Sequence, residues 1–170
     1  MSKELNNLKP FFEDNYRRIS VREYARIIKV SPATASKLLE QYNVEKLLNR
    51  EQDRIYTYYY ANRENALFVQ LLRIYWLQIF NKIGLIGYLE NEFANPVVIL
   101  FGSFAKAEIN PNSDVDIAIF TRSKKELVLG KFQKILKREI QTFIFKSINS
   151  VENKELLPNI LNGFIISGSW

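Results

Sequence analysis

Two apolar runs, separated by a glycine turn and an acidic loop, most constrain the fold of this chain. The run PVVILF over residues 96–101 predicts a buried strand, and DVDIAIF over 114–120 predicts a second. Gly102 directly follows the first run, where glycine permits a sharp turn and lets a phosphate approach the backbone closely. Ser103 is expected to open a short helix and to offer a hydroxyl and free amides to an anion.

Asp114 and Asp116 form the second half of this pattern. Alternate residues of a strand point to one face, so both carboxylates are expected on the same side. Burying two unpaired carboxylates would cost several kcal/mol for each ion. A divalent cation removes that cost, because Mg²⁺ is held by one or two carboxylates together with water and nucleotide phosphates. The alternative interpretation is a surface loop whose acids are simply solvated.

The composition narrows the chemistry of such a site. The 170 residues include no Cys and no His, which excludes disulfides, zinc–cysteine sites, imidazole acid–base catalysis and most transition-metal sites. What remains favours hard cations such as Mg²⁺. A net charge of +6 permits nucleic-acid binding without establishing it. The sequence has no signal-peptide pattern and no apolar run of bilayer length, so we expect a cytoplasmic protein without membrane association.

Residues 20–60 carry the signals of two helices followed by a hairpin. Ser20 and Glu23 have capping-box spacing, which predicts a helix from Val21. Ser31 and Pro32 predict that a second helix opens immediately afterwards. Its inward-facing residues are expected to be Ala35, Leu38, Leu39 and Tyr42. The alternation in LLNREQDRIYTYYY, residues 47–60, predicts a two-stranded wing.

This order of elements resembles the winged helix-turn-helix domain of microbial transcription regulators, over residues 1–61. The resemblance implies a DNA-binding surface at the exposed start of the second helix and on the wing. The residues implied are Ala33, Thr34, Ser36, Lys37, Arg50 and Arg54. A winged helix that mediates only protein contacts is the alternative, because a fold does not establish a function.

Residues 62–94 have a long helical pattern that opens near Asn62. It predicts a helix that connects the N-terminal and C-terminal domains. Apolar residues cover more than one helical stripe, which predicts burial on most sides. They are Leu67, Phe68, Leu71, Leu72, Tyr75, Trp76, Ile79, Phe80 and Ile83. A homodimer contact on this helix is left open. Gly84 and Gly87 predict a bend or break.

Residues 95–170 alternate between strand and helix patterns. After the two strands already described, Ser123 and Glu126 have capping-box spacing ahead of a helix over 126–139. A third strand is predicted at IQTFIF, residues 140–145, then a short helix ended by Gly163 and an edge strand at FIISG. The predicted fold class is therefore α+β, with a small mixed sheet flanked by helices at the C-terminal end.

The stretch GSFAKAE…SDVDIAI, with ten residues between Gly-Ser and the first Asp, resembles the nucleotidyltransferase superfamily of the DNA polymerase beta type. It looks most like the minimal nucleotidyltransferase branch, over about residues 96–170. The resemblance implies that Gly102 and Ser103 hold the β and γ phosphates of a nucleoside triphosphate. Asp114 and Asp116 would bind Mg²⁺, and Lys106 would offset phosphate charge. A solvated helix lysine is the alternative for Lys106.

The implied reaction is attack by an acceptor hydroxyl on the α-phosphorus, with release of pyrophosphate and two metal ions stabilising the attacking and leaving oxygens. The chain departs from the family pattern in two places. Ala107 stands where the family often has Gly. Active members usually carry a third carboxylate on the next strand, where this chain has Gln141, which cannot act as a general base. Glu139 lies on the same face, displaced by about 6.5 Å along the strand.

The leading functional hypothesis is a Mg²⁺-dependent nucleotidyltransferase that moves a nucleoside monophosphate, AMP from ATP, to a protein or RNA hydroxyl. Small members of the family resemble antitoxins that modify a partner toxin, and the N-terminal region adds a potential to bind DNA. The alternative is a DNA-binding regulator whose transferase-like domain senses a nucleotide or is inactive. A third hypothesis is an adaptor that uses both domains for protein assembly.

Overall fold

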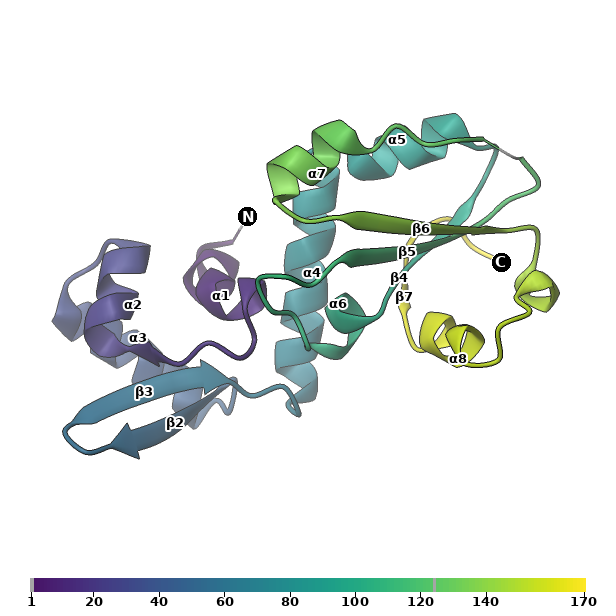
Figure 1. The fold of residues 1–170 in the computed structure, drawn as a ribbon. Coiled ribbons are helices and arrows are strands. Elements are labelled where there is room, and N and C mark those ends of the chain that lie inside the picture. The colour runs from purple at the N-terminus through teal and green to yellow at the C-terminus, as the bar shows by residue number, and fades with distance from the viewer. Residues whose placement is uncertain (1, 124) are drawn as a thin grey trace. The chain divides into compact units, whose positions relative to one another are not determined.

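A computed structural model describes residues 2–123 and 125–170 of the chain. By compactness the chain divides into two units (Figure 1). The first comprises the chain up to Tyr75 together with Ala107–Pro111, and the second comprises Trp76–Lys106 and Asn112–Trp170. Within the described ranges, no helix combines the length and the apolar character needed to cross a membrane.

The first unit contains helices and a small antiparallel sheet in which β3 lies between β1 and β2. Its elements are α1 (Lys3–Glu13), β1 (Ile19–Ser20), α2 (Val21–Ile28), α3 (Pro32–Val44), β2 (Leu48–Asp53) and β3 (Tyr56–Ala61). The structure confirms the two predicted helices and the predicted hairpin, and it adds α1 and β1. The resemblance of this unit to a winged helix-turn-helix domain stays a prediction.

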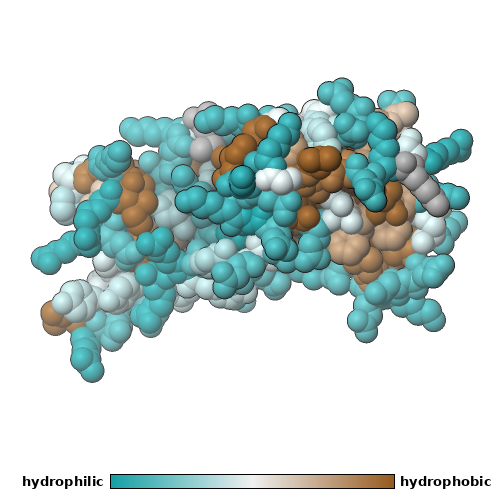
Figure 2. Space-filling view, turned by 45° about the horizontal axis from the view of Figure 1, so that its top comes forward, coloured by the Kyte–Doolittle hydropathy of each residue, from teal (hydrophilic) through white to brown (hydrophobic). Residues whose placement is uncertain are grey.

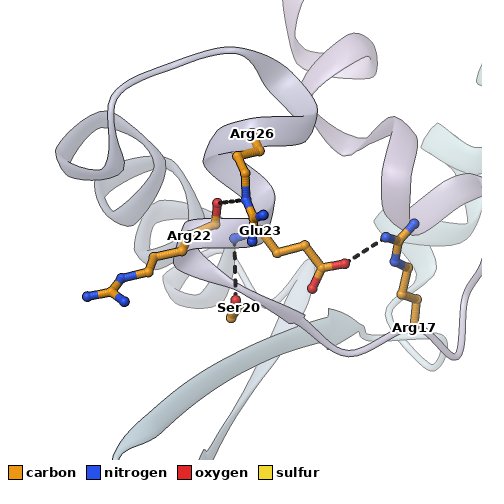
Figure 3. Close-up of polar contacts among 5 residues, drawn as sticks. All are labelled: Arg17, Ser20, Arg22, Glu23 and Arg26. Atoms are coloured by element: carbon orange, nitrogen blue, oxygen red, sulfur yellow. Dashed lines mark hydrogen bonds and ion pairs between the residues drawn. The ribbon is translucent and has the colours of Figure 1, made fainter.

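The two predicted N-caps of this unit are confirmed. The Ser20 hydroxyl accepts a hydrogen bond from the Glu23 amide at 3.3 Å, and the Ser31 hydroxyl accepts one from the Thr34 amide at 3.1 Å. The Glu23 carboxylate forms an ion pair with the Arg17 guanidinium at 2.6 Å (Figure 3). This contact takes the place of the side-chain half of the predicted capping box. These caps satisfy amides that the first helical turn leaves without helical partners.

Asn15 is a buried polar residue of the first unit, and its contacts explain why residues 107–111 belong there. Its side-chain amide donates to the Phe11 carbonyl at 2.7 Å, and its side-chain oxygen accepts from the Ile109 amide at 2.7 Å. The Asn15 backbone amide donates in turn to the Ile109 carbonyl at 2.8 Å. Every one of these buried groups therefore has a partner, as burial requires.

Helix α4 (Ala66–Lys82) begins four residues later than predicted. The side chain of Asn65 accepts a hydrogen bond from the Phe68 amide at 2.9 Å, which caps the helix at that point. Of the residues expected to be buried, only Leu67 is exposed, at 56%, and one further stripe of the helix, which includes Ile74 at 45%, is also exposed. Those confirmed as buried are Phe68, Leu72, Tyr75, Trp76 and Phe80. The predicted break is confirmed at Gly84, which has a φ of 78° and separates α4 from α5 (Leu85–Glu92).

The second unit is built on a four-stranded sheet in the order β6-β5-β4-β7. Strands β5 and β6 are parallel, and β4 is antiparallel to both β5 and β7, so the predicted mixed sheet is confirmed (Figure 1). The strands are β4 (Val97–Phe101), β5 (Val115–Phe120), β6 (Ile140–Phe145) and β7 (Phe164–Ser167). Besides α5, its helices are α6 (Ser103–Lys106), α7 (Gly130–Leu136), the 3₁₀ turn η1 (Ile148–Ser150) and α8 (Leu156–Leu161).

The helix predicted to start after Ser123 begins only at Gly130, so this prediction is wrong. The residues before α7 find partners elsewhere in the unit. The Lys125 ammonium pairs with the Glu92 carboxylate at 2.9 Å, and the Val128 amide donates to the Tyr88 hydroxyl at 2.9 Å. Lys124, which belongs to the predicted cap, lies outside the described residues.

Alternate residues of β4 and β5 bury one face of this sheet against α8. The cluster includes Val97, Ile99, Phe101, Ala118, Phe120 and Ile160. Gly163 ends α8 as predicted, and a Cβ there would lie 2.5 Å from the Leu100 carbonyl oxygen. On the face drawn in Figure 2, hydrophilic side chains cover most of the surface and apolar residues emerge in separate patches.

Candidate functional site

Gly102 brings the backbone of the β4–α6 turn directly against the carboxylate of Asp116. Gly102 has a φ of 68°, in the left-handed region that favours glycine. A Cβ built on this residue would overlap the Asp116 side chain. Asp116 also faces Phe101 across the β4–β5 pair, which fixes this approach. The glycine turn and the acidic pair, which were identified separately in the sequence, therefore form one site.

Asp114, Asp116 and Gln141 come together at the first residues of β5 and β6. Asp116 and Gln141 are register partners in the parallel pair. The Gln141 side-chain amide donates a hydrogen bond to the Asp114 carboxylate at 2.6 Å. Gln141 thus occupies the position next to the acidic pair, and it orients Asp114 without being able to take up a proton.

The electrostatics of this pair favour a cation. Burial raises the pKa of Asp116 above the usual value of a carboxyl group, and the neighbouring charge of Asp114 raises this pKa further. Both causes disfavour the ionised form of Asp116. A bound divalent ion would reverse that balance, because it supplies opposite charge at the point where the two carboxylates repel.

The donor set fits one Mg²⁺ ion, which proteins hold through one or two carboxylates while phosphates and water complete its shell. Across residues 2–123 and 125–170, no group of three or more Asp, Glu, His or Cys side chains is placed to hold a metal ion. Glu139, the predicted weak third carboxylate, is exposed, and its carbonyl accepts a hydrogen bond from the Val115 amide at 2.9 Å. Its carboxylate does not join Asp114 and Asp116 in such a group.

The other residues predicted to bind nucleotide follow Gly102. Ser103 begins the short helix α6, as expected, and Lys106 ends it. The Lys106 ammonium donates to the side-chain oxygen of Asn159 on α8 at 2.8 Å, so this lysine is positioned by a contact that the sequence did not indicate. Ala107 has a φ of 54°, where glycine is the least strained residue.

Arg138 is a residue of the site region that the sequence analysis missed. Its guanidinium donates to the Ser113 carbonyl at 2.8 Å, directly before Asp114. The same group lies 5.4 Å from the ring centre of Phe104 and 5.8 Å from that of Trp76, within range of a cation–π interaction. Arg138 therefore holds the loop that carries Asp114 in position. A single arginine before a strand gives no sequence signal of this role.

The residues predicted to bind DNA lie in the first unit. Ala33, Thr34, Ser36 and Lys37 are exposed along the first half of α3, although Thr34 also takes part in the Ser31 cap. The Arg50 guanidinium lies 3.6 Å from the Glu40 carboxylate. Arg54 occupies the turn between β2 and β3, with a φ of 54°. Their exposure is compatible with a binding surface and does not identify one.

Comparison with known proteins gives a family match that covers this site. Residues 84–167 match the model of a family described as Polymerase beta, Nucleotidyltransferase. The matched segment contains the glycine turn, the acidic pair and all four strands of the second unit. The match supports the nucleotidyltransferase superfamily and, in general terms, nucleotidyl transfer. No curated protein matches the chain.

Proposed function

We propose that this protein is a Mg²⁺-dependent nucleotidyltransferase that moves a nucleoside monophosphate, AMP from ATP, to the hydroxyl group of a protein or RNA. The observation that carries this proposal is the approach of the Gly102 backbone to Asp116, beside Asp114 and Gln141. A half-buried pair of like charges next to a glycine turn suits a metal–triphosphate complex.

Each residue of the site has a part in this proposal. Asp114 and Asp116 would hold Mg²⁺, which neutralises phosphate charge when bound. Gly102 lets the triphosphate approach the backbone, Ser103 offers its hydroxyl, and Lys106, positioned by Asn159, adds positive charge. Gln141 holds the Asp114 carboxylate in place through its hydrogen bond.

The test is incubation of the protein with ATP labelled on the α-phosphate, in Mg²⁺ buffer, together with candidate protein and RNA acceptors. We expect label to be transferred by the natural sequence and not by Asp114→Ala/Asp116→Ala. Circular dichroism of the double variant checks that its fold is intact. Undiminished transfer by the folded double variant would refute the assignment of the site.

A second candidate function is nucleotide sensing without transfer. It is favoured by Gln141, a neutral side chain at the position where a carboxylate would complete the metal site. Calorimetry with ATP and Mg²⁺ separates the two functions. Metal-dependent binding without transfer to any acceptor supports the sensor, whereas transfer supports the enzyme.

DNA binding by the first unit belongs to both proposals. Exposed Lys37 on α3 and Arg54 in the hairpin turn are its main basic candidates. DNA affinity should fall steeply with salt, because phosphate contacts release counterions. Unchanged DNA binding by Lys37→Ala and Arg54→Ala would exclude this surface. An antitoxin-like role and a homodimer remain extensions of the same proposal, to be tested by co-purification with a toxin and by sedimentation.

A further inference from the structure

The four-stranded sheet of the second unit has two edges, and only one of them is protected against pairing with another strand. Proteins commonly protect an open edge by making it short, irregular, charged or covered. Strand β7 forms one edge, has four residues and shifts its register against β4 between Val98 and Ile99. Strand β6 forms the other edge (Figure 1), and its six residues pair with β5 in an unbroken register.

The sequence of β6 also lacks the charges that protect the edges of the first unit. There, β1 has two residues, and β2 carries Arg50, Glu51 and Asp53. The six residues of β6 include no charged residue and no proline, and Ile144 is 37% exposed. Within residues 2–123 and 125–170, no strand pairs with the outer side of β6. This edge is therefore the one most open to a further strand.

The hydrogen bonds between β5 and β6 show which backbone groups of β6 face outward. The carbonyls of Glu139 and Phe145 both accept hydrogen bonds from the β5 side, from amides 2.9 Å away. Because the side to which a residue bonds alternates along a strand, the odd-numbered residues of β6 face β5. The even-numbered residues turn their amides and carbonyls to the open edge. They are Ile140, Thr142 and Ile144.

We propose that the open edge of β6 pairs with the same strand of a second copy of this chain, antiparallel and about a twofold axis at Thr142. Thr142 then faces its own copy, and Ile140 faces Ile144 of the second copy. Each of these three opposed pairs exchanges two backbone bonds, or about six in total. A shift of two residues in either direction would leave one outward-facing residue of each copy unpaired. The two sheets join into one, and the interface is closed and symmetric.

The charge of the chain favours a second copy on this edge and not on a charged surface. The net charge is +6, and a symmetric interface brings equivalent groups together, so an uncharged segment avoids the repulsion. In the proposed register, Gln141 lies opposite Phe143 of the second copy, on the face of the sheet that carries Asp116. Assembly would therefore reach the rim of the candidate site. The pairing goes beyond nucleotidyl transfer and does not depend on it.

The first test is sedimentation equilibrium of the full chain over a range of concentrations. The mass of the natural sequence should approach twice 20.0 kDa. Thr142→Pro removes an amide that faces away from β5, so the sheet itself tolerates it, but two bonds of the symmetric contact are lost. It should weaken the dimer by about tenfold or more. Ile144→Lys places a charge on the edge and should also weaken the dimer.

Matched controls separate this edge from the rest of the surface. Thr142→Ala keeps the backbone amide and should remain dimeric. Leu67→Lys places the same charge as Ile144→Lys on an exposed position of α4, where the sequence left a dimer contact open, and it should also remain dimeric. Circular dichroism checks that every variant keeps its fold.

A second test measures the register. The chain has no cysteine, so Thr142→Cys introduces a single thiol. Directly opposed residues in a hydrogen-bonded pair have Cα atoms about 5.5 Å apart, within the range of about 4.4–6.8 Å that a disulfide spans. Mild oxidation should therefore link two copies of Thr142→Cys. In Ile144→Cys the two thiols lie about 14 Å apart along the strands and should stay unlinked.

A protein that stays monomeric at every concentration would overturn the proposal, even if a strand of some other protein binds to β6. A dimer that survives Thr142→Pro but is lost in Leu67→Lys would place the contact on α4 and would overturn it as well. Equal disulfide formation by Thr142→Cys and Ile144→Cys would contradict the symmetric register. Linking of Thr142→Cys alone, together with a monomeric and folded Thr142→Pro, would support the pairing.

Discussion

The two units of this protein differ in one respect of how their acidic side chains are placed. In the first unit, surface cations meet carboxylates: Arg17 pairs with Glu23, Arg18 with Glu51 and Arg50 with Glu40. In the second, Lys125 pairs with Glu92 in the same way, but Asp114 and Asp116 are neighbouring like charges, and within the described residues neither of these two has an ion-pair partner. Exposed ion pairs contribute only about 0–1 kcal/mol each. An uncompensated pair of carboxylates is therefore the stronger indication of a ligand.

The largest expected effect tests whether the two units are independent in stability. Phe104 is fully buried with its ring centre 4.7 Å from that of Trp76, and Phe12 is fully buried with its ring centre 5.3 Å from that of Tyr75. Either Phe→Ala substitution should lower the free energy of unfolding of its own unit by about 3–5 kcal/mol.

Chemical unfolding followed by tryptophan fluorescence reports the second unit, since both tryptophans lie there, and hydrogen exchange reports the first. Leu67→Ala, at an exposed position, is the control and should change stability by less than about 0.5 kcal/mol. If Phe12→Ala and Phe104→Ala shift both probes equally, the two units unfold together and are not independent in stability.

The next effect concerns the glycine turn. Gly102→Ala places a side chain in the left-handed region and against the Asp116 carboxylate, so it should cost about 1–3 kcal/mol of stability and abolish triphosphate binding. Gly130→Ala is the matched control, because a Cβ there meets no atom within 4 Å. Calorimetry with ATP and denaturant unfolding measure both quantities. Normal ATP binding by Gly102→Ala would remove the main support for the site.

Gln141→Glu tests whether the candidate site of the second unit lacks a third carboxylate. The substitution adds a carboxylate in register with Asp116 and should raise Mg²⁺-dependent transfer by about tenfold, toward the contribution of a positioned acid or base. Gln141→Ala, which only removes the hydrogen bond to Asp114, should not produce this gain. Initial rates with labelled ATP provide the measurement. A slower Glu variant would show that the neutral amide is part of the working site.

In the first unit, the next prediction concerns the N-cap of α2. Ser20→Ala removes the acceptor of the Glu23 amide and should lower the free energy of unfolding by about 1 kcal/mol. Ser36→Ala, at an exposed position inside α3, should be neutral or slightly stabilising, because Ala is the better helix former. Denaturant unfolding compares the two. Equal losses would mean that α2 depends on packing alone.

The smallest effect is a pH dependence. Because burial and Asp114 raise the pKa of Asp116, the folded state binds this proton more tightly than the unfolded state. The contribution of Asp116 to stability is then greatest in acid and is lost as the pH rises through the raised pKa. Asp116→Asn should flatten this part of the profile, and Mg²⁺ with ATP should restore stability at neutral pH only to the natural sequence. An unchanged profile in Asp116→Asn would contradict the assigned cause.

The parts of the fold that the sequence predicted depend on local physics. Apolar runs located β4, β5 and β6, and the hydroxyls of Ser20 and Ser31 located the starts of α2 and α3. The same cap spacing failed at Ser123. There Lys125 and Val128 find partners in α5, more than thirty residues earlier, and no local pattern encodes such a choice.

The residues of the candidate site also fall into two groups, those that the sequence analysis identified and those that only tertiary contacts place there. Gly102, Asp114 and Asp116 follow from strand ends and alternation, whereas the position of Gln141 was implied by the family resemblance, and the structure brings all four together. Arg138 and Asn159 reach the site region through contacts that depend on the tertiary fold. The burial of Leu67 on α4 was overestimated for a related reason, since apolar composition predicts which faces can be buried and not which faces find a neighbour.

The bonds between Asn15 and Ile109 have a practical consequence for anyone who wishes to produce the N-terminal part alone. A fragment that stops after Tyr75 would lose the segment 107–111 and leave the backbone amide and the side-chain oxygen of the buried Asn15 without these hydrogen-bond partners. Such a truncation is expected to aggregate or to require a solubilising fusion, whereas a version that grafts the five missing residues onto its end through a flexible tether should behave as a folded protein.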